Sequence, residues 1–326
     1  MMFLQVAGGL ALLLFGGDVL VRGAVALARR LGVPPLVIGL TIVAFGTSAP
    51  ELVVSIEAAL GGHADIVLGN VVGSNIANVL LIVGAAALVA PIAAAGPALR
   101  REGATLAVLT VLFTLLCLLG AVPRVLGGAM VVLLLSYTLW SFRRARRAVA
   151  PGAAGGVETV SEVSGAPTSL PPAALITLAG IAGIVVGAHI LIEGATAIAR
   201  LAGLSDAVIG LSLIALGTSL PELATSVVAA WRGHGALAMG NAIGSNLFNM
   251  FAITGATALV TTVPVPDQVL GYDLWVMAGV SMLLVAAIYA GGRIGRVTGV
   301  LMIGAYAAYI ASLVVGLPFA VPTQAG

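Results

Sequence analysis

The residues best suited to chemistry form a short block, GTSAPE, which contains two hydroxyls, a proline and a carboxylate: Thr47, Ser48, Pro50 and Glu51. At helical spacing the hydroxyls and the carboxylate share roughly one face. A proline inside a helix removes a hydrogen bond and clashes with the carbonyl four residues earlier, which here belongs to Gly46. We therefore expect the helix to break here and to free backbone carbonyl oxygens beside the side-chain oxygens.

The block occurs again as GTSLPE, with its polar residues at Thr218, Ser219 and Glu222. Residues 39–84 and 210–255 align without a gap at a constant offset of 171, with 22 of 46 positions identical. An apolar composition could match alanines and leucines by chance, but not the acids and amides. Each copy also carries a GSNxxN element, which adds a serine and two asparagines: Ser74, Asn75 and Asn78, then Ser245, Asn246 and Asn249.

These groups are all hard oxygen ligands, which suit calcium and also sodium. Softer metals are disfavoured because Cys117 is the only cysteine and the histidines are not paired. Two carboxylates give a charge of −2, which one Ca²⁺ or two Na⁺ neutralise, whereas an anion would be repelled. An empty site of this charge in a low dielectric is costly, so the carboxylates favour obligatory exchange of cations.

The composition places these residues in a membrane protein. Of the 326 residues 60% are hydrophobic and 8% are charged, against about 25% charged in a soluble domain. That balance excludes a soluble globular protein and a disordered chain. The net charge of +2 is too small to indicate a nucleic-acid partner. We expect an all-α polytopic membrane protein in contact with the lipid bilayer.

Ten stretches are long and apolar enough to span a bilayer: 3–24, 35–59, 65–90, 103–120, 123–142, 173–195, 207–230, 236–262, 272–290 and 295–316. Every odd-numbered connection carries arginines, whereas the even-numbered ones carry only Arg124 and Arg200. Because positive loops stay in the cytoplasm, we expect both termini outside, in the cell (inner) membrane of a bacterium.

The predicted organisation is two five-helix repeat units, 1–142 and 173–326, joined by a short cytoplasmic linker at 143–172. Because five is odd, the second unit would cross the membrane upside down relative to the first. Inverted repeats are common in secondary transporters, whose substrate sites lie near the midplane on interrupted helices. A membrane enzyme has no need of inverted halves.

The two GTSxPE…GNxxGSNxxN blocks resemble the α-repeats of the calcium/cation antiporters, specifically the sodium/calcium exchanger branch and its bacterial members. The resemblance implies exchange of Ca²⁺ for Na⁺ by alternating access, with movement of the first and sixth spans and with both ions bound as substrates rather than cofactors. It makes the two glutamates central ligands, Glu51 and Glu222. It places Thr47 and Thr218 at the calcium site, and Asn78 and Asn249 along the middle. It assigns flanking sodium sites to Ala44, Ser48, Ser74, Ala215, Ser219 and Ser245.

Several alternatives stay open. A proton/calcium or other divalent-cation antiporter is the nearest, although that branch typically has GNAxE in place of GTSxPE. Some relatives carry an aspartate at the position of Asn249, which the potassium-dependent branch links to potassium, so the asparagine argues against potassium coupling. A cation channel could use the same oxygens without a counter-ion. An intramembrane aspartyl protease would need a GxGD motif, which is missing here. The oligomeric state stays open.

The remaining polar residues have a structural interpretation. The other asparagines that occupy equivalent positions in the two copies should hold helices together. They are Asn70, Asn75, Asn241 and Asn246. The i,i+4 pairs Asp18–Arg22 and His189–Glu193 occupy equivalent repeat positions and should satisfy themselves within their helices. His63 and His234 lie near loop ends, where we expect capping. Glu57 has no acidic counterpart and should face a cavity mouth or the surface.

Overall fold

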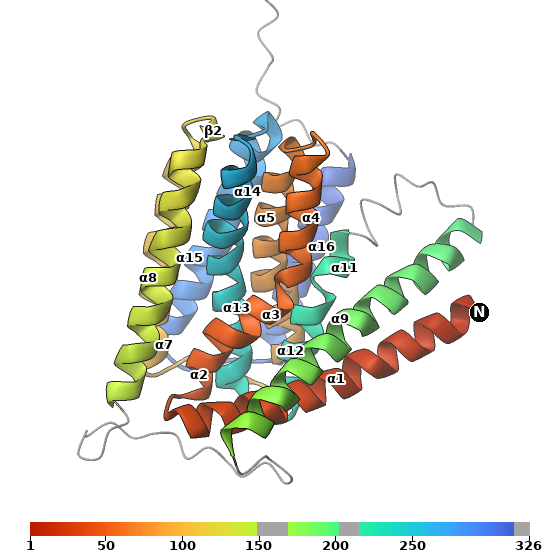
Figure 1. Cartoon of the computed structure of the whole chain (residues 1–326), viewed down its shortest axis with the longest axis vertical. Coiled ribbons are helices and arrows are strands. Elements are labelled where there is room, and N and C mark those ends of the chain that lie inside the picture. Colours follow the sequence, from red (N-terminus) through yellow and green to blue (C-terminus); the bar gives the residue numbers. More distant parts are fainter. Residues whose placement is uncertain (149–168, 202–214, 316–326) are drawn as a thin grey trace, which may run out of the picture. The chain divides into compact units, whose positions relative to one another are not determined.

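The computed structural model describes residues 1–148, 169–201 and 215–315 and is mostly helical in these ranges (Figure 1). By packing, the chain divides into two compact units. The first unit comprises Met1–Pro50 and Thr138–Gly244, and the second comprises Glu51–Tyr137 and Ser245–Gly326. Each unit takes segments from both sequence copies. This division by packing differs from the division by sequence repeat at 1–142 and 173–326, which stays a prediction.

The first unit contains two long helices and several short ones around a broken helix. Its elements are α1 (Met2–Leu31), α2 (Pro35–Ile38), the π-helix η1 (Gly39–Val43), α3 (Ala44–Thr47), the last part of α8 (Arg124–Ala148), α9 (Leu170–Leu201), α11 (Ala215–Thr218), α12 (Leu220–Trp231) and most of α13 (Gly235–Leu247). Buried apolar residues of α1, α9, α12 and α13 form its core, including Leu20, Val25, Ile184, Val228 and Leu237.

Helices α1 and α9 lie side by side along much of their length (Figure 1). Glycines at every seventh residue let their backbones approach, because a Cβ atom at these positions would collide with the other helix. The six glycines occupy equivalent positions of the sequence repeat: Gly9, Gly16 and Gly23, and Gly180, Gly187 and Gly194. A Cβ atom at Gly23 would lie 2.6 Å from the backbone nitrogen of Thr177. The repeat therefore extends into the packing of these two helices.

Replacing one of these glycines should separate the pair. In Gly180→Ala the new methyl group meets the backbone of Leu20, which cannot rotate away. We expect a loss of about 1–3 kcal/mol in the free energy of unfolding, the usual cost of overpacking, measured as a lower thermal midpoint in detergent. Gly183→Ala on the same helix is the control, because its Cβ atom would lie 3.4 Å from Gly16, an ordinary contact. Equal effects of the two substitutions would contradict this packing.

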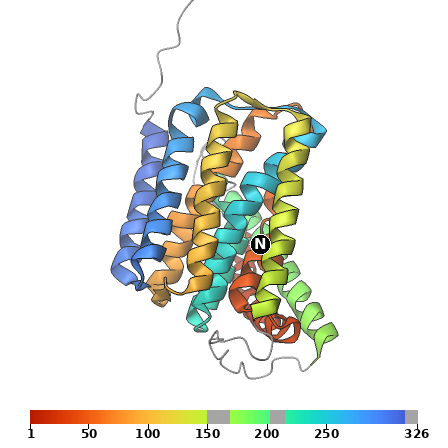
Figure 2. The same ribbon diagram turned by 90° about the vertical axis from the view of Figure 1, so that its left-hand side faces the viewer.

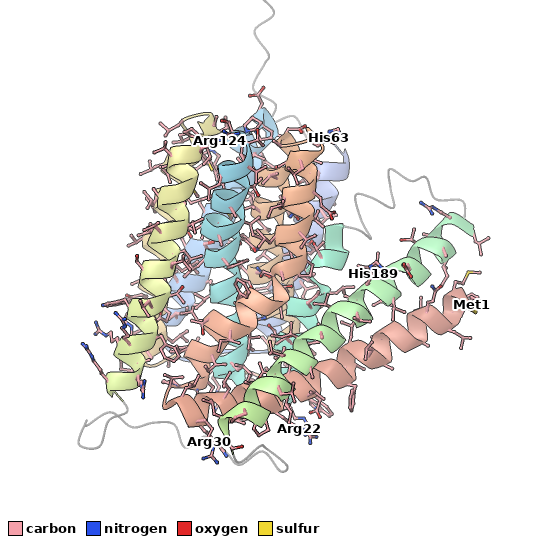
Figure 3. The ribbon with its side chains drawn as sticks, in the orientation of Figure 1. Met1, Arg22, Arg30, His63, Arg124 and His189 are labelled. Atoms are coloured by element: carbon pink, nitrogen blue, oxygen red, sulfur yellow. The ribbon has the colours of Figure 1, made fainter. Side chains whose placement is uncertain are left out.

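A charged cluster ties α1 to the end of α12. Arg22 pairs with Asp18 one turn away at 2.8 Å, as the spacing predicted, and Arg232 after α12 also contacts Asp18. Figure 3 shows Arg22 and Arg30 on the half of α1 remote from Met1. His189 and Glu193 pair in the same way on α9, at 3.1 Å. The i,i+4 pairing is confirmed for both, and the contact with Arg232 adds a link between two elements.

His234, at the start of α13, is buried next to this cluster. Its carbonyl accepts hydrogen bonds from the backbone N–H groups of Leu237 and Ala238, so it caps the helix through its backbone. Burial, and then the charges of Arg29 and Arg232, lower the pKa of its imidazole below the ordinary value of 6.5. The neutral form is therefore the one that the folded chain favours.

This shift predicts a loss of stability in mild acid. As the pH falls below 6.5 the unfolded chain takes up a proton that folded His234 resists, so the free energy of unfolding decreases until the lower folded pKa is reached. The thermal midpoint should fall between pH 7 and pH 5, and His234→Gln should flatten that fall. His63→Gln serves as the control. An unchanged pH profile in His234→Gln would contradict the prediction.

The second unit is built from helices that the two sequence copies contribute in matching positions. From the first copy come most of α4 (Ala49–Leu60), α5 (Asp65–Ala77), η2 (Asn78–Val83), α6 (Gly84–Val89), β1 (Ile92–Ala93), α7 (Pro97–Cys117), β2 (Ala121–Val122) and the first part of α8. From the second come η4 (Phe248–Ile253), α14 (Thr254–Val260), β3 (Val263–Pro264), η5 (Val269–Asp273), α15 (Leu274–Ala290), β4 (Arg293–Ile294) and α16 (Arg296–Val315). Helix α7 packs beside α15 (Figure 2).

The peripheral parts of the second unit are exchanged between the two copies. Strand β1 pairs with β4, and β2 pairs with β3, both antiparallel. The helices next to these strands also contact each other at glycines. A Cβ atom at Gly84 would lie 3.1 Å from the Gly299 carbonyl oxygen, and one at Gly127 would lie 2.7 Å from that of Gly255. In the second unit, the strands and adjoining helices of each sequence copy therefore pack against those of the other copy.

Seven helices of the described ranges are long and apolar enough to cross a membrane, and a bent pair, Pro35–Thr47 with Ala49–Leu60, raises the number to eight. Helix α7 has 21 residues but carries Arg100, Arg101 and Glu102 near its start. The expected span at 207–230 lies partly outside the described residues, as does most of the expected linker. Helices α8 and α9 run into both ends of that linker, to Ala148 and from Leu170.

Candidate functional site

Both proline-containing blocks break their helices as the sequence predicted. Helix α3 ends at Thr47 and α4 begins at Ala49, with φ −85° and ψ 6° at Ser48 between them. In the second copy α11 ends at Thr218 and α12 begins at Leu220, with φ −86° and ψ 2° at Ser219. The two backbones thus match at equivalent positions. Each break precedes a proline that cannot donate a backbone hydrogen bond.

Glu222 is the buried acid of the proline-containing block in the first unit. It is 2% exposed, in the first turn of α12. The hydroxyl of Ser48 donates a hydrogen bond of 2.7 Å to its Oε1 atom. Its Oε2 atom is buried and accepts no hydrogen bond from the described residues. A serine from the first break therefore meets the glutamate from the second, and one carboxylate oxygen is left for another positive partner.

Asn241 links this glutamate to the rest of the site. Its side chain on α13 is fully buried and accepts a hydrogen bond of 3.3 Å from the Thr47 hydroxyl. Its amide nitrogen donates to the Ser226 hydroxyl at 3.1 Å and to the backbone carbonyl of Glu222 at 3.5 Å. From the sequence, Asn241 was expected to hold helices together, and it was not predicted to lie next to Thr47 and Glu222. The signal was present, because Asn241 and Ser226 both recur in the first copy, as Asn70 and Ser55.

The second unit holds the other central acid and most of the amides. Glu51, in the first turn of α4, is 1% exposed. Helix α5 packs against η4, and several polar side chains on these two segments and next to them are buried. The predicted site residues among them are Ser74, Asn78, Ser245 and Asn249. Asn70 donates a hydrogen bond of 3.0 Å to Ser55. Asn78 and Asn249 belong to π-helices, a geometry frequent at functional sites.

Several acceptor oxygens of these residues are buried without a donor from the described residues. They include Oδ1 of Asn78, Oδ1 of Asn249 and Oγ of Ser245, as well as Oε2 of Glu222 in the first unit. Buried polar atoms are almost always paired, and exceptions point to a water or an ion. No group of three or more His, Cys, Asp or Glu side chains in the described ranges could hold a metal ion. A cation bound among these residues would therefore take most of its ligands from neutral oxygens.

The remaining predicted residues also lie at the breaks. Ala44 begins α3 and is buried, and its carbonyl accepts a hydrogen bond of 3.0 Å from the Ser48 N–H and lies 3.4 Å from the Thr47 hydroxyl. Ala215 begins α11, Thr218 ends it half-buried, and Ser219 is buried. The structure thus brings Ala44, Thr47 and Ser48 together with Glu222 in the first unit.

The chain matches the family model described as sodium/calcium exchanger protein over residues 1–143 and 172–315. It belongs to this family. The putative antiporter CaxA of Alkalimonas amylolytica is 38% identical over 308 residues, which cover 92% of this chain and 95% of CaxA. The sodium/calcium exchanger MaX1 of Methanosarcina acetivorans is 35% identical over 344 residues, which cover 95% of this chain and 98% of MaX1.

Solved structures of the sodium-calcium exchanger NCX_Mj agree with this membership. One structure, soaked with 2.5 mM Na⁺ and 0.1 mM Ca²⁺, matches with a TM-score of 0.82 at 29% sequence identity, over 96% of this chain and 98% of NCX_Mj. The family resemblance inferred from the two GTSxPE blocks is therefore confirmed. Members of the exchanger family are transporters, which supports a non-enzymatic role.

The hydrogen bond from Ser48 to Glu222 should be measurable by itself. Ser48→Ala removes the donor and leaves Oε1 of a buried carboxylate unpaired, which costs about 1–3 kcal/mol. We expect a lower thermal midpoint in sodium- and calcium-free buffer. Thr41→Val is the control, because the Thr41 hydroxyl donates to the Val37 carbonyl of its own turn, at 2.6 Å. A Ser48→Ala midpoint equal to that of the control would show that the hydrogen bond contributes nothing.

Proposed function

We propose that this protein is a secondary antiporter that exchanges Ca²⁺ for Na⁺ across the cell membrane by alternating access. The observation that carries the proposal is the buried set of hard oxygen donors around the two helix breaks. In the first unit this set contains Ser48, Glu222 and the Ala44 carbonyl. In the second it contains Glu51 with the amides of Asn78 and Asn249. Family membership as a sodium/calcium exchanger supports the same ions.

The chemistry of the donors explains why the transport would be an exchange. Calcium accepts six to eight oxygens in flexible geometry, and broken helices supply carbonyls as well as side chains. The two glutamates carry −2 together, which one Ca²⁺ or two Na⁺ neutralise. Crossing the bilayer with both charges exposed is costly. The carrier therefore changes sides with cations bound, and the gradient of one ion drives the other.

The proposal includes ten spans in two inverted five-helix repeats, with both termini outside and the central linker in the cytoplasm. The arginines of the odd-numbered connections support this orientation. The matched break geometry at Ser48 and Ser219 supports the repeat itself. Helices α1 and α9 are the proposed moving elements, because their interlocked glycines suit them to move as one body.

Sodium is the proposed coupling ion. The chain carries GTSxPE in both copies rather than the GNAxE that is typical of proton/calcium exchangers. The relatives MaX1 and NCX_Mj are both described as sodium/calcium exchangers. Potassium coupling is not part of the proposal, because Asn249 provides no third carboxylate.

Uptake of ⁴⁵Ca²⁺ into proteoliposomes tests the proposal. With sodium inside and none outside, uptake should be fast, and imposed potassium or proton gradients should not replace sodium. Glu51→Gln and Glu222→Gln should each lower the initial rate by at least tenfold, because each removes half of the charge that binds the cations. Glu57→Gln is the control, since Glu57 lies on the same helix as Glu51 but is exposed.

Three outcomes would overturn the proposal. Uptake driven by a proton gradient alone would make the protein a proton/calcium antiporter. Uptake without any opposing cation would make it a channel. Normal uptake in Glu51→Gln or Glu222→Gln would remove the carboxylates from the transport site.

A further inference from the structure

We propose that Asn241 is a positioning residue that turns the Thr47 hydroxyl so that its oxygen lone pairs face the transported cation. This inference rests on the proposed function, because it concerns the same site. Asn241 lies on α13, whereas Thr47 ends α3 and Glu222 begins α12. One buried amide thus touches three elements of the first unit.

The hydrogen bonds of Asn241 fix which end of its amide faces Thr47. The nitrogen end has two acceptors, the Ser226 hydroxyl at 3.1 Å and the Glu222 carbonyl at 3.5 Å. The oxygen end therefore faces Thr47, whose hydroxyl lies 3.3 Å away. An amide oxygen can only accept, so the single hydroxyl proton of Thr47 is donated to it.

That direction matters because the proton has other acceptors. The Ala44 carbonyl lies 3.4 Å from the Thr47 hydroxyl, and the Glu222 carboxylate already accepts the hydroxyl proton of the next residue, Ser48. A proton turned to the carboxylate would stand between the carboxylate and a cation and would repel that cation. Donation to Asn241 removes the proton from this space, and the hydroxyl then presents only its lone pairs.

Close packing holds the amide in its position. Glycines at Gly39 and Gly240 bring α13 so near to α2 and η1 that a Cβ atom at either would collide with the facing backbone. At Gly39 the collision would be with the Leu237 carbonyl oxygen, at 2.5 Å. A side chain on such a closely packed segment is pre-organised and does not need to be ordered when the cation binds.

The same amide-to-serine bond occurs in the other copy, which makes a chance arrangement untenable. In the second unit Asn70 donates to Ser55 at 3.0 Å, and these positions correspond to Asn241 and Ser226 at the offset of 171. Both copies therefore anchor this asparagine by its nitrogen end.

A double-mutant cycle on cation binding tests the inference. The purified full-length chain in detergent is titrated with Ca²⁺ in sodium-free buffer, and then with Na⁺, by calorimetry. Asn241→Ala should weaken Ca²⁺ binding about fivefold to tenfold, the value of one buried hydrogen bond. In a Thr47→Val background, which has no hydroxyl to orient, Asn241→Ala should cause no further loss. A purely structural role would give additive losses.

Two further variants keep the test decisive. Asn70→Ala combined with Thr47→Val should be additive, because the side-chain nitrogen of Asn70 donates to Ser55 and not to Thr47. If Asn241→Ala does not fold, Ser226→Ala replaces it. This change frees the nitrogen end of the amide and should cause a smaller loss of affinity that Thr47→Val again abolishes.

The outcomes separate this inference from the proposed function. Additive losses for Asn241 and Thr47, or unchanged affinity in Asn241→Ala, would overturn the inference and leave sodium-driven calcium uptake intact. Coupled losses in a protein that shows no such uptake would overturn the proposed function and leave the inference standing.

Discussion

A carboxylate buried in an apolar environment has to be compensated, and Glu222 of the first unit is such a group. Moving an ionised carboxyl group out of water costs several kcal/mol unless hydrogen bonds or positive charges replace the hydration. Ser48 supplies one hydrogen bond, and the buried Oε2 atom is left to another partner. The first unit therefore stabilises the Glu222 carboxylate only in part.

The helix breaks follow from the same constraint. An unbroken apolar helix keeps all its carbonyl groups for itself and can offer a cation only side chains. A proline after Ser48 or Ser219 frees carbonyl groups and sets the following glutamate at the start of a new helix. Close glycine contacts then hold the short segments that result. Around Leu36 and Leu40 they come from Gly240 and Gly244 of α13. This packing keeps the short segments ordered, although the helix breaks leave some of their backbone groups unpaired.

Much of this arrangement could be predicted from the sequence, because it depends on local rules. The breaks at Ser48 and Ser219 follow from two prolines, and the pairs Asp18–Arg22 and His189–Glu193 follow from helical spacing. Contacts between distant segments could not be predicted in the same way. The residues next to Arg232 in the sequence do not indicate that Arg232 contacts Asp18 on α1. Those next to Asn241 do not indicate that its side-chain oxygen accepts a hydrogen bond from Thr47. The two compact units also cut across the sequence repeat, since packing follows exchanged segments rather than chain order.

The exchanged strands of the second unit have a consequence for how the chain is made. Strand β1 at Ile92 finds its partner only at Ile294, and Gly84 meets its neighbour only at Gly299. During synthesis the amino-terminal half has to wait in the bilayer with these surfaces uncovered until nearly the whole polypeptide has left the ribosome. A chain truncated after its first half lacks the partners of β1 and Gly84 and cannot complete this packing.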